Sequence, residues 1–306
     1  MSPLLIIEQL LNGLQLGFML FVMAAGLTLV LGIMNLVNLA HGSLYMIGAF
    51  VAASVAGASG SFVLGLLVAL PVTALVGMAL EMTVLRRLYE RDHLDQVLAT
   101  FGMILFFNEL TKIIWGPRAL FLDGPRWLAH SIEVLPDLSY PAYRLAIIVI
   151  GLVIAAGLYV LISKTRLGML IRAGASDREM VAALGVNIKS LYTWIFGIGA
   201  LLAALAGVLA GPIYAVEVGM GEDILIITFV VVIVGGIGSV RGALIGGLLI
   251  GLVDTTCRAF LPFIFRTFLP PSSADGISAS LASMSIYIFM AIILTWRPKG
   301  LFPAHA

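Results

Sequence analysis

Two asparagines, a histidine and a serine interrupt a strongly apolar part of the chain at residues 34–50, MNLVNLAHGSLYMIGAF. Their amide, imidazole and hydroxyl groups can hydrogen-bond a polar solute, and the neighbouring glycines weaken a helix. Residues 9–33, just before this segment, carry no charge. A break in the backbone inside lipid is tolerated only where protein packs against it or where it lines a wet cavity. The segment therefore predicts either part of a solute path or a site of close helix packing.

A second interrupted segment, VGGIGSVRGALIGGLLIG, occupies residues 234–251. Both segments place a Gly-Ser pair and a basic or titratable residue, His41 or Arg241, before a glycine-spaced apolar helix. Such a pair in the two halves of a chain is typical of transporters built from internal repeats. The likeness is short, so a repeat and a chance match both stay open. The residues predicted to line a solute path are Asn35, Asn38, His41, Gly42, Ser43, Gly235, Gly236, Gly238 and Ser239.

The choice between a solute path and close helix packing differs between the glycines and the polar residues of these segments. Close packing of backbones is the favoured interpretation of the glycines taken alone. For Asn35, Asn38 and His41 the solute path is the favoured interpretation. Polar side chains are costly beside lipid, so these three are expected to face the interior or the cytoplasmic interface. His41 could equally be an interfacial residue that a backbone carbonyl satisfies. Asp254 and Arg258, four residues apart, favour an ion pair within one helix over a proton relay.

The most informative polar segment is TRLGMLIRAGASDREMVAALGVNIKS, residues 165–190. Its SDRE sequence predicts a capping box, with Ser176 as the N-cap and Glu179 three residues later, and Gly185 fits the position after a helix end. A helix over 177–184 is too short to be stable alone in water, so it needs a partner surface. That surface is either its own membrane domain or another subunit. The residues predicted to make such a contact are Asp177, Arg178, Glu179, Met180, Val181, Leu184 and Gly185.

These segments belong to an integral membrane protein. Hydrophobic residues make up 61% of the 306 residues and charged residues 11%, with a mean hydropathy of +1.12. Soluble domains carry about twice that share of charge. The net charge of +1 and the lack of a basic block give no sign of a nucleic-acid partner. The single cysteine, Cys257, excludes an intrachain disulfide and a cysteine metal cluster.

Uncharged runs of membrane-spanning length predict an all-α polytopic bundle of eight or nine transmembrane helices, with Gly-rich broken helices in each half. One domain fills residues 1–306, and the 164–189 loop lies within it. The N-terminus has no basic stretch and carries Glu8, so a cleaved signal peptide is not expected. The predicted spans lie within residues 10–40, 42–80 (two spans), 96–115, 145–163, 190–216, 224–240, 242–262 and 276–296.

The distribution of lysine and arginine predicts the orientation. With the N-terminus outside and alternating spans, eleven of the seventeen basic residues fall on the cytoplasmic side. They lie in the 34–43 break, 86–95, 164–189, the 234–241 break and the tail after residue 296. This arrangement places the C-terminus inside and favours nine spans over eight. The 116–140 loop is then expected outside.

Four segments together, MNLVNLAHGSLYMIGAF, LGMLIRAGASDREMVAALGVN, GGIGSVRGALIGG and the tail RPKGLF, resemble the permeases of branched-chain amino acid ABC importers. The likeness covers nearly the whole chain in the right order, and it is greatest to the smaller leucine/isoleucine/valine permease with a short N-terminus. It implies a subunit of a bacterial or archaeal cytoplasmic membrane. The implied partners are a second related permease, two cytoplasmic ATP-binding subunits, an extracytoplasmic solute-binding protein and the lipid bilayer. It also implies that the segment from Asp177 to Gly185 contacts the ATPases.

One departure bears on the solute. After the AHG sequence many relatives carry an acidic residue, whereas this chain has Ser43. Members of the family also carry urea, short amides and other amino acids, so the solute stays open. No P-loop, nucleophile elbow or metal-spaced His/Cys cluster occurs, and the chain is therefore expected to be no enzyme, to hold no cofactor and to borrow ATP energy from its partners. The alternatives from other classes are a stand-alone secondary transporter or channel and an intramembrane enzyme.

Overall fold

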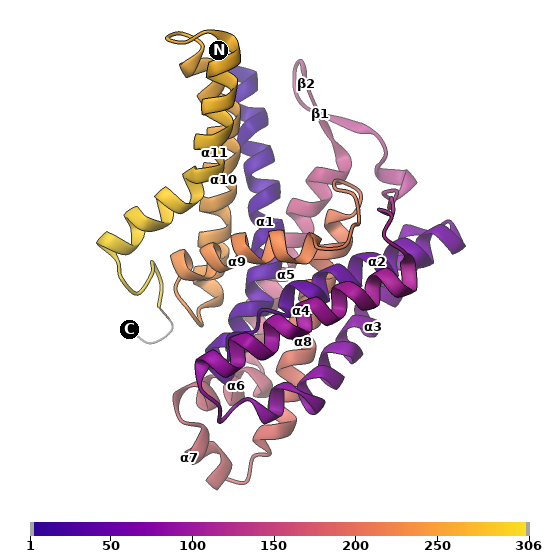
Figure 1. The fold of residues 1–306 in the computed structure, drawn as a ribbon, viewed down its shortest axis with the longest axis vertical. Helices are drawn as coiled ribbons and strands as arrows, with labels where there is room; N and C mark the ends of the chain where they lie inside the picture. The colour runs from indigo at the N-terminus through magenta and orange to yellow at the C-terminus, as the bar shows by residue number, and fades with distance from the viewer. Residues whose placement is uncertain (1–2, 304–306) are drawn as a thin grey trace.

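A computed structural model describes residues 3–303 (Figure 1). The long helices are α1 (Pro3–Met34), α2 (His41–Ser59), α3 (Phe62–Thr83), α4 (His93–Trp115), α5 (Ala142–Lys164), α8 (Ile188–Ala210), α9 (Met220–Gly235), α10 (Val240–Phe265) and α11 (Pro271–Trp296). The shorter elements are η1 (Leu85–Arg87), η2 (Arg126–Leu128), α6 (Arg166–Ser176), α7 (Arg178–Ala183) and an antiparallel hairpin of β1 (Ser131–Leu135) and β2 (Leu138–Pro141). The chain is thus an α-helical membrane bundle, as its apolar runs predict.

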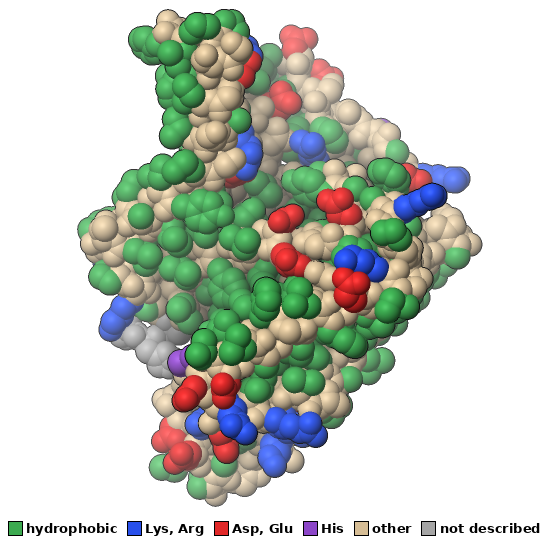
Figure 2. Space-filling view, in the orientation of Figure 1, with side chains coloured by type: hydrophobic (Ala, Val, Ile, Leu, Met, Phe, Trp, Pro, Cys, Tyr) green, Lys and Arg blue, Asp and Glu red, His purple; other side chains and the backbone are tan. Residues whose placement is uncertain are grey.

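Burial separates central from peripheral helices. In the most apolar stretch of α1, 83% of the residues are buried within the chain, and in that of α8, 78%. The corresponding shares are 17% in α5 and 11% in α10. A helix that is apolar on all sides must bury every face in protein or lipid, so the exposed apolar faces of α5 and α10 fit contact with lipid. Figure 2 shows hydrophobic side chains over much of the visible surface, one group of charged side chains at the lower end, near α7 and the start of α4, and another over the middle.

The helix α2 begins deep inside the bundle. A Cβ on Gly26 of α1 would lie 3.1 Å from Nε2 of His41 and 2.7 Å from the carbonyl oxygen of Gly199. Gly199 is the middle residue of α8, which spans the bundle. The non-helical residues 35–40 therefore run back into the interior before α2 starts. The 34–43 break, which the charge distribution assigned to the cytoplasmic side, is thus mostly buried in the bundle, and among its first residues Asn35 is exposed.

A second re-entrant segment follows α8, where the sequence predicted a span continuing to residue 216. The helix ends at Ala210, and residues 211–219 are not helical. Val216 forms an antiparallel bridge with Leu120 of the 116–140 loop, which places this segment near that face. The chain then re-enters as α9, whose 16 residues cover about 24 Å, less than the ~30 Å hydrocarbon core.

The two halves of the bundle repeat one arrangement. The order α1, break, α2, turn, α3, α4 matches α8, break, α9, turn, α10, α11. The packing matches too: α1 packs on α10 as α8 packs on α3, and α2 packs on α8 as α9 packs on α1. Equivalent helices also meet each other, at Gly26 with Gly199 and at Gly42 with Gly221. Because α1 and α8 run in opposite directions through the bundle, the two halves form an inverted repeat (Figure 1).

This repeat pairs different segments from those matched in the sequence. The equivalent of the break at 35–40 is residues 211–219, and the Gly-rich 236–239 turn between α9 and α10 corresponds to the short turn between α2 and α3. The shared Gly-Ser pairs of residues 42–43 and 238–239 are thus not equivalent positions. The signal for the true partner is the GP dipeptide at residues 211–212, a frequent helix terminator.

Candidate solute path and coupling segment

Apart from Gly236, the predicted path residues fall into two groups, one deep and one at the end of the bundle. The deep group contains Asn38, His41, Gly42 and Ser43, all buried. Oδ1 of Asn38 accepts a hydrogen bond from the Ala40 N–H at 3.1 Å, which fixes the turn into α2. Nδ2 of Asn38 has no hydrogen-bond partner among the described residues, and the His41 imidazole interacts with the Met23 backbone without reaching good hydrogen-bond geometry. Buried polar atoms are nearly always satisfied, so these atoms stand out in this part of the bundle.

At the centre of the deep group, two helix N-termini meet. Gly42 in the first turn of α2 packs on Gly221 in the first turn of α9, and a Cβ on either would lie 2.1 Å from the carbonyl oxygen of the other. Only glycine permits this approach, so the packing interpretation of Gly42 is supported. Helix N-termini favour negative charge, which Glu222 in the first turn of α9 supplies. The Glu222 carboxylate accepts a hydrogen bond from the side-chain amide of Asn108 on α4.

The end group lies where α1, α6 and the α9–α10 turn come together. Asn35 is exposed, has a φ of 50° and lines a cleft of about 410 Å³ with Gly238 and Arg178. Ser239 caps α10, accepting the Gly242 N–H at 3.0 Å, and with Gly238 lines a larger cleft of about 1490 Å³. Gly235 packs on the backbone of Gly242. None of the deep residues Asn38, His41, Gly42 and Ser43 lines either cleft, so the structure separates the two groups.

Gly236 belongs to a third setting. It has a φ of 108° and lies under the chain at Phe302. The N–H groups of Leu301 and Phe302 donate to the carbonyls of Val234 and Gly235, both at 2.9 Å. The tail after α11 is therefore fixed to the end of α9, and Gly236 serves this contact.

The predicted coupling segment forms two short helices, α6 and α7. The N-cap of α7 is Asp177, whose Oδ1 accepts the N–H groups of Glu179 and Met180 at 3.0 and 2.9 Å. The prediction of Ser176 as the cap is wrong, because Ser176 is the last residue of α6. Arg178 and Glu179 are exposed in the first turn of α7. Gly185 has a φ of +88°, as expected for the residue that ends this segment.

The apolar side chains of this segment do not share one face. Val181 is 5% exposed and packs within the chain, whereas Met180 and Leu184, four residues apart, are 59% and 76% exposed. The expectation that all three form one docking surface is therefore wrong for Val181. Burial of Val181 holds the helix to its own domain, and Met180 and Leu184 are left as an exposed apolar pair.

A buried carboxylate at the end of α3, Glu81, links this helix to α8 through hydrogen bonds, a role that the sequence alone did not indicate. Glu81, fully buried, accepts hydrogen bonds from Arg86 at 3.0 Å, from Tyr89 Oη at 2.6 Å and from Thr193 Oγ1 at 2.6 Å. Burial and the hydrogen bond to Glu81 raise the pKa of the Tyr89 hydroxyl. The signal in the sequence was an acid within an apolar run followed by two arginines.

Asp254 and Arg258 form the predicted pair at 2.8 Å.

A family described as branched-chain amino acid transport system / permease component matches residues 9–294. The chain belongs to this permease family. It is 31% identical to the high-affinity branched-chain amino acid transport system permease protein LivH of Salmonella typhimurium, over 83% of this chain and 87% of that protein. It is also 31% identical to the similarly named BraD of Pseudomonas aeruginosa, over 96% of this chain and 95% of that protein.

More distant relatives of this permease include the ribose import permease protein RbsC of Escherichia coli, with 26% identity over 81% of this chain and 77% of that protein. No solved structure matches this permease. The family match and the apolar helices together assign it to transport across a membrane rather than to a soluble function.

Proposed function

We propose that this permease is the membrane-spanning subunit of an importer for branched-chain amino acids or related small polar solutes, driven by separate ATP-binding subunits. The observation that carries the proposal is the family match over residues 9–294. The relatives named for branched-chain amino acids support that solute class, and the ribose permease keeps the solute range wider. The partners are a second related permease, two cytoplasmic ATPases and an extracytoplasmic binding protein. ATP hydrolysis belongs to the partners, so the chain itself is not an enzyme.

Uptake into proteoliposomes tests this function. The chain, co-purified with its ATPase, second permease and binding-protein partners, is expected to accumulate leucine, isoleucine or valine only when ATP is present. Ribose and urea serve as the competing solutes. Accumulation that proceeds without ATP, or without the ATPase subunits, would indicate a stand-alone transporter and reject the proposal.

The orientation proposed is N-terminus outside and C-terminus in the cytoplasm of a bacterium or archaeon. In its support, the clefts near α6 are lined by segments 32–35, 172–178, 237–241 and 297–303, which the distribution of basic residues assigns to one side. In intact cells, an impermeant thiol reagent is expected to label Ser131→Cys in β1 but not Ser176→Cys at the end of α6. The Cys257→Ser background removes the native thiol. The reverse labelling pattern would invert the orientation.

The proposed contact with an ATPase is the exposed apolar pair Met180 and Leu184. Exposed apolar side chains on a cytoplasmic helix are in unfavourable contact with water unless a partner covers them. Leu184→Asp is expected to insert normally and to lose the co-purifying ATPase and uptake. Leu184→Met keeps an apolar side chain of similar volume and is expected to retain both. Equal ATPase retention by the two variants would show that this pair is not the contact.

The deep group is proposed as the part of the solute path nearest the centre of the bundle. Three features support it: α2 and α9 start in the interior, their N-termini meet, and Asn38 and His41 hold unsatisfied polar atoms there. Discontinuous helices of this kind hold the solute sites of several transporter folds. Asn35, Gly238 and Ser239 are proposed to lie at the cytoplasmic mouth, and Gly235 and Gly236 to support the turn beside it.

A further inference from the structure

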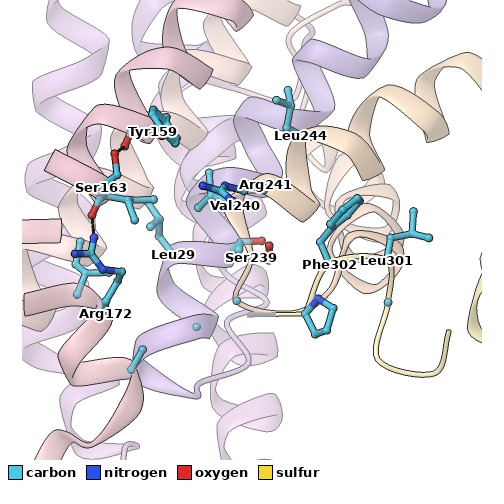
Figure 3. A pocket seen from close by; sticks show the side chains of 18 of the residues that line it. Leu29, Tyr159, Ser163, Arg172, Ser239, Val240, Arg241, Leu244, Leu301 and Phe302 are labelled. Atoms are coloured by element: carbon cyan, nitrogen blue, oxygen red, sulfur yellow. Dashed lines mark hydrogen bonds between the residues drawn. The ribbon is translucent and has the colours of Figure 1, made fainter. Parts of the chain in front are cut away.

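A large cleft combines apolar side chains with several basic ones, among them Arg172 and Arg241 (Figure 3). It has a volume of about 1490 Å³ and lies between α1, α5, α6, the start of α10 and the tail after α11. Its wall is built from apolar side chains of three helices, among them Phe21, Leu29, Leu152 and Leu244. Because α5 is one of the least buried of the long helices, the side of the cleft that it forms lies at the periphery of the bundle, where lipid could reach it.

The apolar wall has the depth of one leaflet of a bilayer. On α1 the lining runs from Phe21 to Ile33, a rise of about 18 Å, and on α5 from Leu152 to Ser163, a rise of about 16 Å. Half of the hydrocarbon core of a bilayer is about 15 Å thick. A small soluble ion would leave most of this wall uncovered, whereas an acyl chain would cover it.

The cationic end holds Arg172, Arg241, Arg297 and Lys299. Within residues 3–303, no Asp or Glu lines the cleft, and none of these four residues takes part in an ion pair. Arg172 donates to the carbonyl of Ile162, and the Arg241 guanidinium lies 5.7 Å from the centre of the Tyr159 ring. Figure 3 shows Arg241 and Tyr159 facing each other across the cleft. A carbonyl and an aromatic ring orient these cations but leave their charge uncompensated.

We propose that this cleft binds an anionic phospholipid. The phosphate lies among Arg172, Arg241 and Lys299 at the level of the headgroups, and an acyl chain follows the wall formed by α1 and α5. Basic pockets between transmembrane helices on the cytoplasmic side suit anionic headgroups, and the apolar depth supplies what a free phosphate would lack. The lipid would connect α6, which leads into α7, with the fixed tail and the α9–α10 turn. The proposal does not depend on which solute is carried.

The test uses the purified full chain in a neutral detergent, with lipid binding followed by native mass spectrometry and by thermal unfolding. Phosphatidylglycerol is expected to stay bound and to raise the unfolding temperature. Phosphatidylcholine with the same chains, and inorganic phosphate at millimolar concentration, are expected to do neither. Added salt is expected to weaken the binding of phosphatidylglycerol, a readout that needs no variant.

A matched pair of double variants locates the site. Arg241→Gln with Lys299→Gln is expected to weaken phosphatidylglycerol binding about thirtyfold, as for two cations near an anionic headgroup. Arg166→Gln with Lys189→Gln removes two exposed cations outside the cleft and is expected to leave binding unchanged. If inorganic phosphate alone raised the unfolding temperature, the cleft would bind a soluble anion and the lipid proposal would be rejected. Binding that does not depend on salt, equal binding of both lipids, or equal effects of both double variants would overturn the proposal. A cleft double variant that changes the oligomeric state of the chain but not its lipid binding would overturn it as well.

Discussion

The conformation of Gly185 permits a sharp test of the coupling segment. Its φ is +88°, a region that costs a residue with a side chain about 1–2 kcal/mol. A Cβ at this position would meet no atom within 4 Å, so the cost of a substitution is purely conformational. Gly185→Val therefore strains the exit from α7 without a clash against the membrane domain.

The size of this strain is comparable with what holds α7 in place. The six-residue helix is fixed by the Asp177 cap, worth about 1 kcal/mol, and by burial of Val181, worth about 1.5–3 kcal/mol. A loss of 1–2 kcal/mol lowers the ratio of the native to the displaced arrangement of α7 about 5- to 30-fold. We expect Gly185→Val to reach the membrane at normal levels while ATPase co-purification and ATP-driven uptake fall, by at most this factor.

Asparagine tolerates the left-handed region better than other residues with side chains, so Gly185→Asn is the matched control. It is expected to retain most of the ATPase and of the uptake rate. Wild-type behaviour of Gly185→Val would refute the assignment of α7 as the coupling element. Equal losses in the valine and asparagine variants would refute the conformational explanation.

Three further outcomes follow from the packing. Gly42→Ala places a Cβ 2.1 Å from the Gly221 carbonyl oxygen. Thermal unfolding is expected to show a destabilisation of about 1–3 kcal/mol, or the variant fails to fold. The control Gly57→Ala on the same helix meets no atom within 4 Å and is expected to be neutral or stabilising. Glu81→Gln removes the charge that Arg86 faces and is expected to lower the free energy of unfolding by roughly 2–3 kcal/mol, a moderate loss because Arg86 is partly exposed. Glu109→Gln, in an exposed ion pair, is expected to shift the unfolding temperature little. Equal shifts would reject a structural role for Glu81. Asn38→Leu is expected to lower uptake at normal membrane levels, and an unchanged rate would leave this asparagine a purely structural role.

The sequence predicted what depends on local composition. Runs of apolar residues located nearly all of the long helices, and Gly185 correctly placed the end of the short one. The choice between Ser176 and Asp177 as N-cap could not be made, because both are good capping residues and α6 had to be known to end at Ser176. Likewise, the burial of Val181 beside the exposed Met180 depends on the position of the rest of the domain, which helix periodicity does not contain.

Tertiary contacts decide the rest of the candidate site. The sequence joined the Gly-rich turn at 236–239 to the break at 35–40 because both carry Gly-Ser pairs. In the structure the equivalent of that break is residues 211–219, whose amino-acid sequence has little similarity to that of the break. Repeats of this kind are preserved in helix order and packing, so a match of residue letters finds the wrong partner. The cleft lined by Arg241 could not be predicted either, because its four cations come from three separate segments: α6, the start of α10 and the tail after α11.

The inverted repeat has an energetic consequence. Inverted repeats let several transporter folds expose a central site to opposite sides in turn, and identical halves would make those two states equal in free energy. Such a balance has no preferred direction of its own. The helices α5, α6 and α7 have no counterpart in the first half, so they are where the equivalence of the two states is broken. A force applied at α7 would act on this unmatched segment and could tilt the balance without deforming either half.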